Sequence, residues 1–437
     1  MARSPKPHAQ PRLDRLAEWL VAISGFQQPV DQSLSSRFRA HPFLGPRERA
    51  FLAESVYAAV RHWGAHASLL RAEGFKPSAS TYARRQAMLA ASLSVGVDRM
   101  VSEITEGERA WLLAALDKLE AEAQPATRLS LPNWVWNDWV AQLGPEEALA
   151  CGRSMLSPAG LDIRVNTQRA KTAEVLQALQ DFGVAARSST VLEEAIHVEG
   201  KPGLQKMAAF LAGAFEVQDL GSQLLARLAA PKRGSFVVDY CAGAGGKTLA
   251  LGALMRNTGR LYALDRSVAR LARIKPRLAR SGLSNVWPIA ITGATDDRVK
   301  RLRGKAELVL VDAPCTGLGT LRRNPDLKWR QTPDSLAELV ALQAEILDAA
   351  AQLCAPQGRL VYATCSTSRA ENEDQVQAFL GRHPEFVQVN SLERLAQQGV
   401  SLPEHWQALA DGGAMRLWPH RTETDGFYGA MLVKQPV

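Results

Sequence analysis

Just past its middle, the chain reads Val237-Val238-Asp239-Tyr240-Cys241-Ala242-Gly243-Ala244-Gly245-Gly246-Lys247-Thr248. The apolar residues around Val237 predict a buried strand, and the glycines predict a turn into a helix that begins near Lys247. Glycines let a ligand approach the backbone closely, and a helix amino terminus offers oriented N–H groups to an anionic or carboxylate-bearing ligand. This stretch therefore predicts the first unit of an α/β sheet, with a binding site at the strand end.

A second predicted strand, Arg260–Leu264, ends in Asp265. Its distance from the glycine turn matches the acidic residue that binds ribose hydroxyls in dinucleotide-type folds. Together the turn and Asp265 predict a nucleoside-binding half-site. A tight turn without a ligand is the alternative interpretation, and the presence of Asp265 disfavours it.

Two other kinds of glycine-rich binding site, the phosphate loop and the nicotinamide site, match this turn less well. The ending Gly-Gly-Lys-Thr is similar to a phosphate loop, but the first glycine of such a loop is absent because 240–242 carry none. This disfavours nucleotide hydrolysis. A nicotinamide site needs the spacing Gly-x-Gly-x-x-Gly, which Gly243, Gly245 and Gly246 do not give.

Two cysteines directly follow predicted parallel strands. Cys315 comes after the apolar run 306–311 in Asp312-Ala313-Pro314-Cys315, and Cys365 comes after 359–362 in Ala363-Thr364-Cys365-Ser366. In open α/β sheets the carboxyl ends of the strands carry the active site, where a thiol can act as a nucleophile. Burial as a small packing residue is the commoner fate of a cysteine, but two thiols at strand ends disfavour it here. We expect no reactive thiol among the other three cysteines. Cys151 would pack in the core and Cys354 in an apolar helix, and Cys241 would contribute its backbone to the turn.

Composition narrows the function classes. The 437 residues are 46% hydrophobic, which is enough for two or three domains. No apolar run approaches the roughly 20 residues of a membrane span. The basic, proline-rich residues 1–7 precede an amphipathic segment rather than the apolar core of a secretory signal, so we expect a cytoplasmic protein.

Five cysteines without zinc-ligand pairing predict neither a disulfide framework nor a metal site. The pI of about 9.3 and net charge of +8 favour a polyanionic partner, although a solvated surface can also account for them.

The pattern of apolar residues predicts three domains. Residues 1–125 are helical, and residues 126–215 hold linker helices followed by a small α+β subdomain. In residues 216–437 strands alternate with helices, which predicts a parallel doubly wound sheet. The predicted fold class is therefore α/β, with an all-α domain in front.

The chain resembles the Sun-type family of RNA (cytosine-5) methyltransferases, which use S-adenosylmethionine. The resemblance covers roughly 134–433 and rests on 241–248, 312–317, 322–326, 364–366, 371–373, 213–223 and 419–428. It implies a Rossmann-like methyltransferase domain behind an RNA-recognition-like subdomain. More weakly, 44–61 resembles the helical RNA-binding domain, related to an antitermination factor, that bacterial RsmB-like members carry in front.

The resemblance also implies catalytic roles. Carbon 5 of cytosine is a poor nucleophile until a thiolate adds to carbon 6, so the reaction needs a cysteine. By similarity, Cys365 is that nucleophile, and Cys315 assists the release step. Asp312 is implied to hydrogen-bond the base edge near ring nitrogen 3, and also to lie at the cofactor.

By the same resemblance, the cofactor is S-adenosylmethionine. Asp265 would bind its ribose, and the turn would embrace its methionine end through Cys241, Ala242, Gly243, Ala244, Gly245, Gly246 and Lys247. Lys247 could also be solvated. The sequence departs from the family twice: Gly243-Ala244 replaces a common Ala-Pro, and 291–295 stand where an adenine-contacting Asp is usual. Thr292 or a backbone amide could substitute, whereas Asp296 comes late in the loop.

RNA is the implied partner, with Arg322 and Arg323 as phosphate contacts beside the pocket. A further basic cluster, which could equally be a solvated helix face, comprises Arg266, Arg270, Arg273, Lys275, Arg277 and Arg280. The target base must be unstacked to react, so a loop or single strand is the expected substrate.

We expect a monomeric enzyme that methylates 16S ribosomal RNA, because the front domain resembles that of RsmB. The alternatives are a transfer RNA methyltransferase of the same chemistry and a non-catalytic RNA-binding assembly factor. The presence of both cysteines argues against the assembly factor. A DNA enzyme is disfavoured because its nucleophile would belong to the first cysteine motif.

Overall fold

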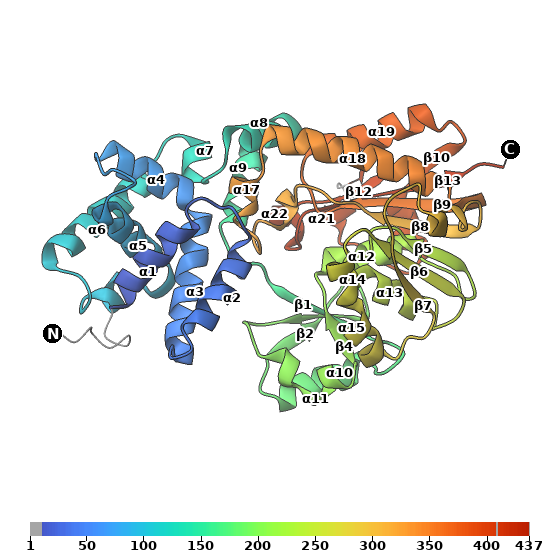
Figure 1. Ribbon diagram of the computed structural model, residues 1–437, viewed down its shortest axis with the longest axis horizontal. Coiled ribbons are helices and arrows are strands. Elements are labelled where there is room, and N and C mark those ends of the chain that lie inside the picture. The colour runs from blue at the N-terminus through green and yellow to red at the C-terminus, as the bar shows by residue number, and fades with distance from the viewer. Residues whose placement is uncertain (1–10, 408–409, 437) are drawn as a thin grey trace. The chain divides into compact units, whose positions relative to one another are not determined.

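A computed structural model describes residues 11–407 and 410–436 (Figure 1). The described chain forms two compact units. The first extends to Ser157 and also includes Leu321–Thr332, and the second comprises Pro158–Thr320 and the chain from Pro333 onward. The amino-terminal stretch 1–7, interpreted above as no secretory signal, lies outside the described residues.

The first unit is helical. Its long helices have an apolar stripe that packs into a shared core, in which Leu16, Trp19, Leu52 and Met88 are fully buried. They are α1 (Arg12–Ile23), α2 (Val30–Ala40), α3 (Pro46–Arg61), α4 (Trp63–Ala72), α5 (Ser80–Val95), α6 (Glu106–Glu120), α8 (Asn133–Leu143) and α9 (Pro145–Met155), with short α7 (Pro125–Arg128).

The segment Leu321–Thr332, which contains α17 (Leu327–Arg330), packs against the end of α3. Lys328 Nζ donates to the carbonyl of Arg61 at 2.7 Å, and Trp329 Nε1 donates to the carbonyl of Val60 at 2.9 Å. These donors satisfy carbonyls that the last helical turn leaves without partners, so the segment caps α3.

The second unit begins with a small α+β subdomain. Its antiparallel sheet has the order β2-β3-β1-β4, and α10 (Thr172–Asp181) packs on it through Val175 and Leu179. The strands are β1 (Leu161–Val165), β2 (Ala186–Ser188), β3 (Ala195–Val198) and β4 (Phe215–Val217), and the short α11 (Ala208–Leu211) precedes β4.

A larger sheet of the order β11-β12-β13-β9-β8-β5-β6-β7 forms the rest of the unit, with β10 paired to β13. The five strands from β7 to β9 are parallel, and β13 is antiparallel to β9. The bounds are β5 (Phe236–Asp239), β6 (Arg260–Asp265), β7 (Val286–Ala290), β8 (Ala306–Asp312), β9 (Cys354–Thr364), β10 (Phe386–Val389), β11 (Ala410–Asp411), β12 (Ala414–Leu417) and β13 (Phe427–Lys434).

Helices cover both faces of this sheet, so its central strands are buried (Figure 1). One layer holds α18 (Pro333–Ala351) and α19 (Glu373–Arg382), and the other holds α12 (Leu220–Ala229) and α13 (Gly246–Leu254). Shorter helices lie in the connections: α14 (Val268–Ala272), α15 (Ile274–Ser281), α16 (Asp297–Lys300), α20 (Ser391–Gln397), α21 (Glu404–Gln407) and α22 (Pro419–Thr422). The predicted α/β fold class is confirmed.

Cys354 lies at the start of a strand. Cys354 is buried as predicted, but its assignment to a helix was wrong: α18 ends at Ala351, and Cys354 begins β9. The apolar run of α18 continues into the strand, so periodicity alone does not mark the boundary. Over the described ranges, no helix has the length and apolar character that crossing a membrane requires.

Candidate active site

A cavity of about 820 Å³ lies at the carboxyl ends of β5, β6, β8 and β9. Its wall includes the glycine turn, Asp265, the loop 291–295, the segment from Asp312 to Cys315, and Cys365. The fold therefore brings the predicted catalytic residues and the predicted cofactor residues to one cavity, except Gly245, which does not line it. This is the edge at which open α/β sheets bind their ligands.

The glycine turn owes its shape to two left-handed residues. Gly243 has φ +56° and Gly245 has φ +84°, a region that side chains disfavour. A Cβ on Gly245 would also lie 2.8 Å from Cγ1 of Ile274. Gly243 N donates to Asp265 Oδ2 at 2.8 Å, so the turn and the acidic strand end are directly joined. The structure thus brings the turn and Asp265 together, as the spacing indicated.

Asp239 ends β5 behind the turn and is fully buried. Thr248 Oγ1 donates to its Oδ2 at 2.6 Å, while Oδ1 has no hydrogen-bond partner. Burial raises the pKa of Asp239 to about 7. The carboxyl group is therefore protonated in mildly acidic solution and ionises near neutrality.

The raised pKa of Asp239 predicts a pH-dependent stability. Between the ordinary aspartate value and pH 7 the folded state keeps a proton that the unfolded chain has released. This stabilisation is present below about pH 4 and is lost as the pH rises to 7, a change of roughly 4 kcal/mol. Asp239→Asn cannot ionise. We therefore expect its free energy of unfolding, relative to that of the wild type, to increase as the pH rises from about 4 to 7. Urea titrations at several pH values measure it. The control Asp117→Asn, at an exposed site on α6, should show the same pH dependence of the free energy of unfolding as the wild type. The same pH dependence in Asp239→Asn as in this control would contradict the prediction.

The two strand-end cysteines lie side by side. Cys315 Sγ and Cys365 Sγ are 3.4 Å apart, and both thiols are free. The contact with Cys365, together with burial, raises the pKa of Cys315 well above its ordinary value. Cys315 is therefore a protonated thiol beside Cys365.

Lys247 points into the cavity rather than into solvent. Its Nζ lies 2.8 Å from Asp312 Oδ2, and only 9% of the residue is exposed. Burial alone would lower the pKa of Lys247, but the Asp312 carboxylate and the nearby Cys365 outweigh it and raise the pKa. Lys247 is therefore a buried cation next to Asp312 and near Cys365, and not a solvated side chain.

Glu371 is a residue of this site to which the sequence analysis gave no role. It is completely buried, and its carboxylate accepts hydrogen bonds from Thr316 N (2.8 Å), Thr316 Oγ1 (2.5 Å) and Gln343 Nε2 (3.0 Å), and from Ser366 Oγ. One carboxylate therefore ties the residue after Cys315 to the residue after Cys365. The signal in the sequence was a charged residue shortly after a strand end, in the quoted stretch 371–373.

Replacing Glu371 tests this brace. Glu371→Gln replaces one accepting oxygen with an NH₂ group that faces hydrogen-bond donors and cannot accept from them. We therefore expect the free energy of unfolding to fall by about 3 kcal/mol. Methyl transfer should fall as well, because the two thiols lose their fixed separation. The matched control is Glu338→Gln at an exposed position on α18, which should change neither quantity. Thermal unfolding and transfer assays on both variants measure the effects. Unchanged stability of Glu371→Gln would contradict the assignment.

The loop that replaces the usual adenine-contacting Asp folds back on itself. Thr292 N and Oγ1 donate to Asp296 Oδ2 at 2.9 and 3.2 Å, and Arg298 pairs with the same carboxylate. Asp296 is therefore engaged within its loop, while 291–295 line the cavity. Thr292, suggested above as a substitute for the adenine-contacting Asp, therefore has both its backbone N–H and its hydroxyl bonded to Asp296.

The two predicted RNA-binding arginines do not belong to the unit that holds the cavity. Arg322 and Arg323 belong to the segment that clusters with the helical unit, where Arg61 Nη2 donates to the Arg322 carbonyl at 3.0 Å. Neither residue lines the cavity of the second unit.

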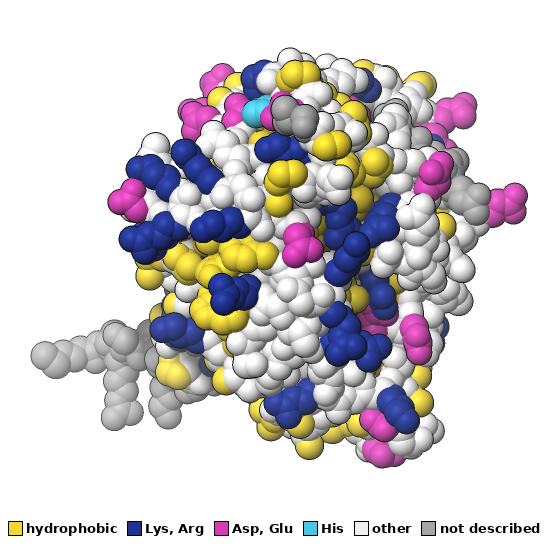
Figure 2. Space-filling model, turned by 90° about the vertical axis from the view of Figure 1, so that its right-hand side faces the viewer, with side chains coloured by type: hydrophobic (Ala, Val, Ile, Leu, Met, Phe, Trp, Pro, Cys, Tyr) yellow, Lys and Arg dark blue, Asp and Glu magenta, His cyan; other side chains and the backbone are white. Residues whose placement is uncertain are grey.

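The second basic cluster divides into paired and exposed members. Arg277 and Arg280 pair with Glu216, and Arg270 pairs with Asp265. Arg266, Arg273 and Lys275 are exposed. Figure 2 shows basic side chains gathered in several groups on one face of the molecule, a distribution that suits phosphates.

Comparison with known proteins shows the family of the chain. The model of the 16S rRNA methyltransferase RsmB/F family matches residues 226–433, and the model of the ferredoxin-like domain of RsmF/B-like methyltransferases matches 131–205. A probable ribosomal RNA small subunit methyltransferase B of Synechocystis is 30% identical, over 93% of this chain and 95% of its own. The chain belongs to the RsmB/F family. The ribosomal RNA small subunit methyltransferase B of Vibrio cholerae is 31% identical over 95% of this chain and 97% of its own.

Solved structures extend the comparison to three dimensions. The crystal structure of PH0851 has a TM-score of 0.76 at 28% identity and covers 97% of this RsmB/F chain and 99% of its own. NSun6 from Pyrococcus horikoshii with SFG has a TM-score of 0.61 at 22% identity, over 69% of this chain and 98% of its own, and it shares the fold. As an RsmB/F member, the protein is an S-adenosylmethionine-dependent RNA methyltransferase, as the motif resemblance implied.

The cavity fits the family's cofactor. Its volume suits a small-molecule ligand, one edge is the open backbone of the glycine turn, and a buried carboxylate stands at the end of β6. Within the described part of the chain, no group of three or more His, Cys, Asp or Glu residues could hold a metal ion.

Proposed function

We propose that this protein methylates carbon 5 of a cytosine in 16S ribosomal RNA, acting as a monomer in the cytoplasm. The observation that carries the proposal is the pair of thiols 3.4 Å apart on the wall of a cavity that also exposes the glycine turn. The relatives are ribosomal RNA small subunit methyltransferases B, which favours ribosomal over transfer RNA.

In this proposal the cofactor binds between the glycine turn, Asp265 and the loop 291–295. Gly243, Ala244 and Gly246 face the cavity, and Asp265 offers a carboxylate to ribose hydroxyls. When bound, S-adenosylmethionine supplies an electrophilic methyl group.

Cys365 then adds through its sulfur to carbon 6 of the flipped cytosine, and the electron pair of the 5,6 double bond makes carbon 5 nucleophilic. Asp312, beside Lys247, hydrogen-bonds the base edge near ring nitrogen 3 and favours its protonation as the thiolate adds. Carbon 5 takes the methyl group and keeps its hydrogen, so a proton must leave before the product is released.

Cys315 takes that proton. Its pKa is raised chiefly by the neighbouring Cys365 thiol. Once the Cys365 sulfur is bonded to carbon 6 as an uncharged thioether, this cause disappears, so Cys315 releases its own proton to water and acts as a thiolate base toward the carbon 5 proton. Loss of the proton from carbon 5 restores the double bond and expels the Cys365 thiolate.

The test is transfer of labelled methyl from S-adenosylmethionine to RNA from cells that lack this gene, followed by mapping of the labelled nucleotide. Small ribosomal subunits, naked 16S RNA and transfer RNA are assayed in parallel. We expect one 5-methylcytosine in 16S RNA. Label in transfer RNA alone would replace the substrate, and no label in any RNA despite cofactor binding would favour a non-catalytic assembly factor.

A further inference from the structure

Two arginines that do not line the cavity donate hydrogen bonds to the glycine turn. Arg277, on α15, donates from Nη1 to the carbonyl of Ala244 at 2.6 Å. Arg164, on β1, donates from Nη1 to the carbonyl of Gly246 at 3.1 Å. The two carbonyls flank Gly245, the left-handed residue of the turn, so both sides of its strained conformation are tied to a cation.

Both arginines are anchored by the small α+β subdomain. Arg164 is a buried residue of its sheet, faces Glu216 across the pairing of β1 with β4, and also donates to Gln218 Oε1. Arg277 binds the same Glu216 through Nε and Nη2, at 3.2 and 2.9 Å. Burial lowers the pKa of Arg164 to about 10, so the guanidinium stays charged at neutral pH.

The subdomain also fits closely against the end of α15. Asn166 Nδ2 donates to the carbonyls of Gly213 and Ser281, both at 3.0 Å. A Cβ on Gly213 would lie 1.9 Å from the carbonyl oxygen of Arg280, so no side chain fits between them. The position of Arg277 is therefore fixed by the subdomain on two sides.

We propose that Arg164 and Arg277 are positioning residues for the cofactor, which makes the ferredoxin-like subdomain part of the framework of the cofactor site. They fix the carbonyls of Gly246 and Ala244 so that the turn is held in its binding conformation before the cofactor arrives. Charge-assisted hydrogen bonds from an anchored guanidinium are strong enough to hold a glycine turn that is otherwise entropically costly to order. This inference rests on the proposed function only in taking the cavity as the S-adenosylmethionine site.

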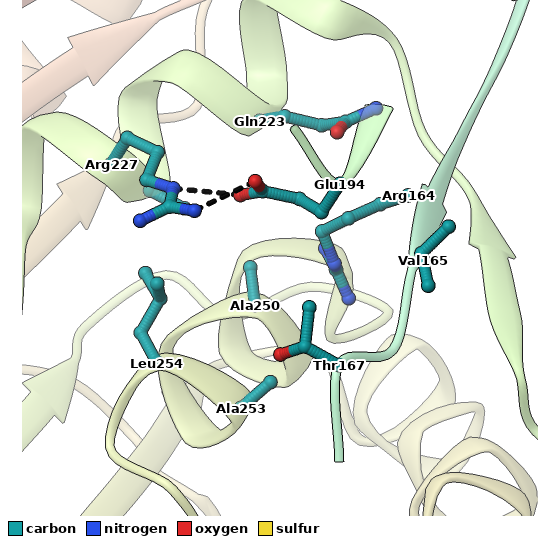
Figure 3. A pocket seen from close by; sticks show the side chains of 10 residues that line it. Arg164, Val165, Thr167, Glu194, Gln223, Arg227, Ala250, Ala253 and Leu254 are labelled. Carbon is teal, nitrogen blue, oxygen red and sulfur yellow. Dashed lines mark hydrogen bonds and ion pairs between the residues drawn. The ribbon is translucent and has the colours of Figure 1, made fainter. Parts of the chain in front are cut away.

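The chain offers a matched control for each arginine. Arg280 binds Glu216 as Arg277 does, and its guanidinium lies 4.1 Å from the ring of Phe210, but among the described residues it makes no hydrogen bond to the turn. Arg227 bridges the subdomain and α12 through two bonds to Glu194, at 2.7 and 2.6 Å. Figure 3 shows Arg227 and Arg164 around one small cavity of about 30 Å³, with only Arg227 joined to Glu194.

The experiment measures binding of S-adenosylhomocysteine to the full chain by calorimetry, without RNA. We expect Arg277→Gln to weaken binding about tenfold, equivalent to roughly 1.4 kcal/mol, and Arg280→Gln to leave it within about twofold. Arg164→Gln should likewise weaken binding, with Arg227→Gln as its control, and Arg164→Lys should recover part of the loss. Amide hydrogen exchange at 243–248 in the ligand-free protein should quicken in the Arg277 and Arg164 variants only.

Equal weakening by Arg277→Gln and Arg280→Gln, or unchanged exchange at the turn, would overturn the positioning role. If Arg164→Gln does not fold, the Arg277 and Arg280 pair still decides the matter. Failure of the wild type to bind S-adenosylhomocysteine would instead overturn the proposed cofactor site itself, so the two failures are distinguishable.

Discussion

Cys365→Ala is expected to abolish methyl transfer, with a fall of at least roughly 10³-fold, or about 4 kcal/mol of barrier lowering. Without a thiolate on carbon 6, carbon 5 of cytosine does not become nucleophilic, and the other two cysteines that line the cavity, Cys241 and Cys315, are thiols whose pKa is raised. Binding of S-adenosylhomocysteine should be unchanged, because the glycine turn and Asp265 are untouched.

Cys354→Ala is the control for this substitution. Cys354 lies on the same strand, β9, but is buried at its opposite end and does not line the cavity. We expect it to keep transfer at close to the wild-type rate. An RNA substrate containing 5-fluorocytosine, which cannot lose a proton from carbon 5, should trap the wild type covalently and should not trap Cys365→Ala. Native-rate transfer by Cys365→Ala would reject the assignment of the nucleophile.

Cys315→Ala is expected to stop turnover after covalent addition. Cys365 can still add and carbon 5 can still take the methyl group, but the base that removes the proton is missing, so the enzyme stays bonded to RNA. A denaturing gel should show a covalent complex with unmodified RNA, which the wild type does not accumulate. Multiple-turnover transfer should fall by roughly 10²- to 10⁴-fold, the usual contribution of a positioned general base.

The double variant separates addition from release. Cys315→Ala combined with Cys365→Ala should form no complex, because nothing adds to carbon 6. A complex in the double variant would show that another residue is the nucleophile. Free turnover by Cys315→Ala alone would remove the release role from that cysteine and leave its contact with Cys365 as packing.

The elements that carry the site were predictable from the sequence because they are local. An apolar run that ends in an acidic residue or a cysteine marks a buried parallel strand and its functional end, which identified Asp265, Asp312, Cys315 and Cys365. The glycine turn was recognisable for the same reason, since its residues are contiguous. The family motifs added the roles of these residues, which periodicity alone does not give.

Contacts between distant residues were not predictable in this way. Glu371 meets Thr316 across 55 positions, Lys247 meets Asp312 across 65, and Arg164 meets Gly246 across 82. Nothing in the local pattern around a charged residue specifies its partner. The sequence left Arg277 and Arg280 as members of a basic cluster that either binds phosphates or is a solvated helix face, and the structure pairs both with the buried Glu216.

The sequence by itself determined the alternation of strands and helices, the glycine turn and the strand ends, because these follow from hydrophobic period and backbone preference within a few residues. Only the tertiary structure decided which side chains meet at those ends. It set the two thiols 3.4 Å apart, placed Lys247 against Asp312, buried Glu371 between the cysteine loops and assigned 321–332 to the helical unit. The physical reason is that buried charges must find partners, and the packing of the whole sheet and its helices determines which partners lie within reach.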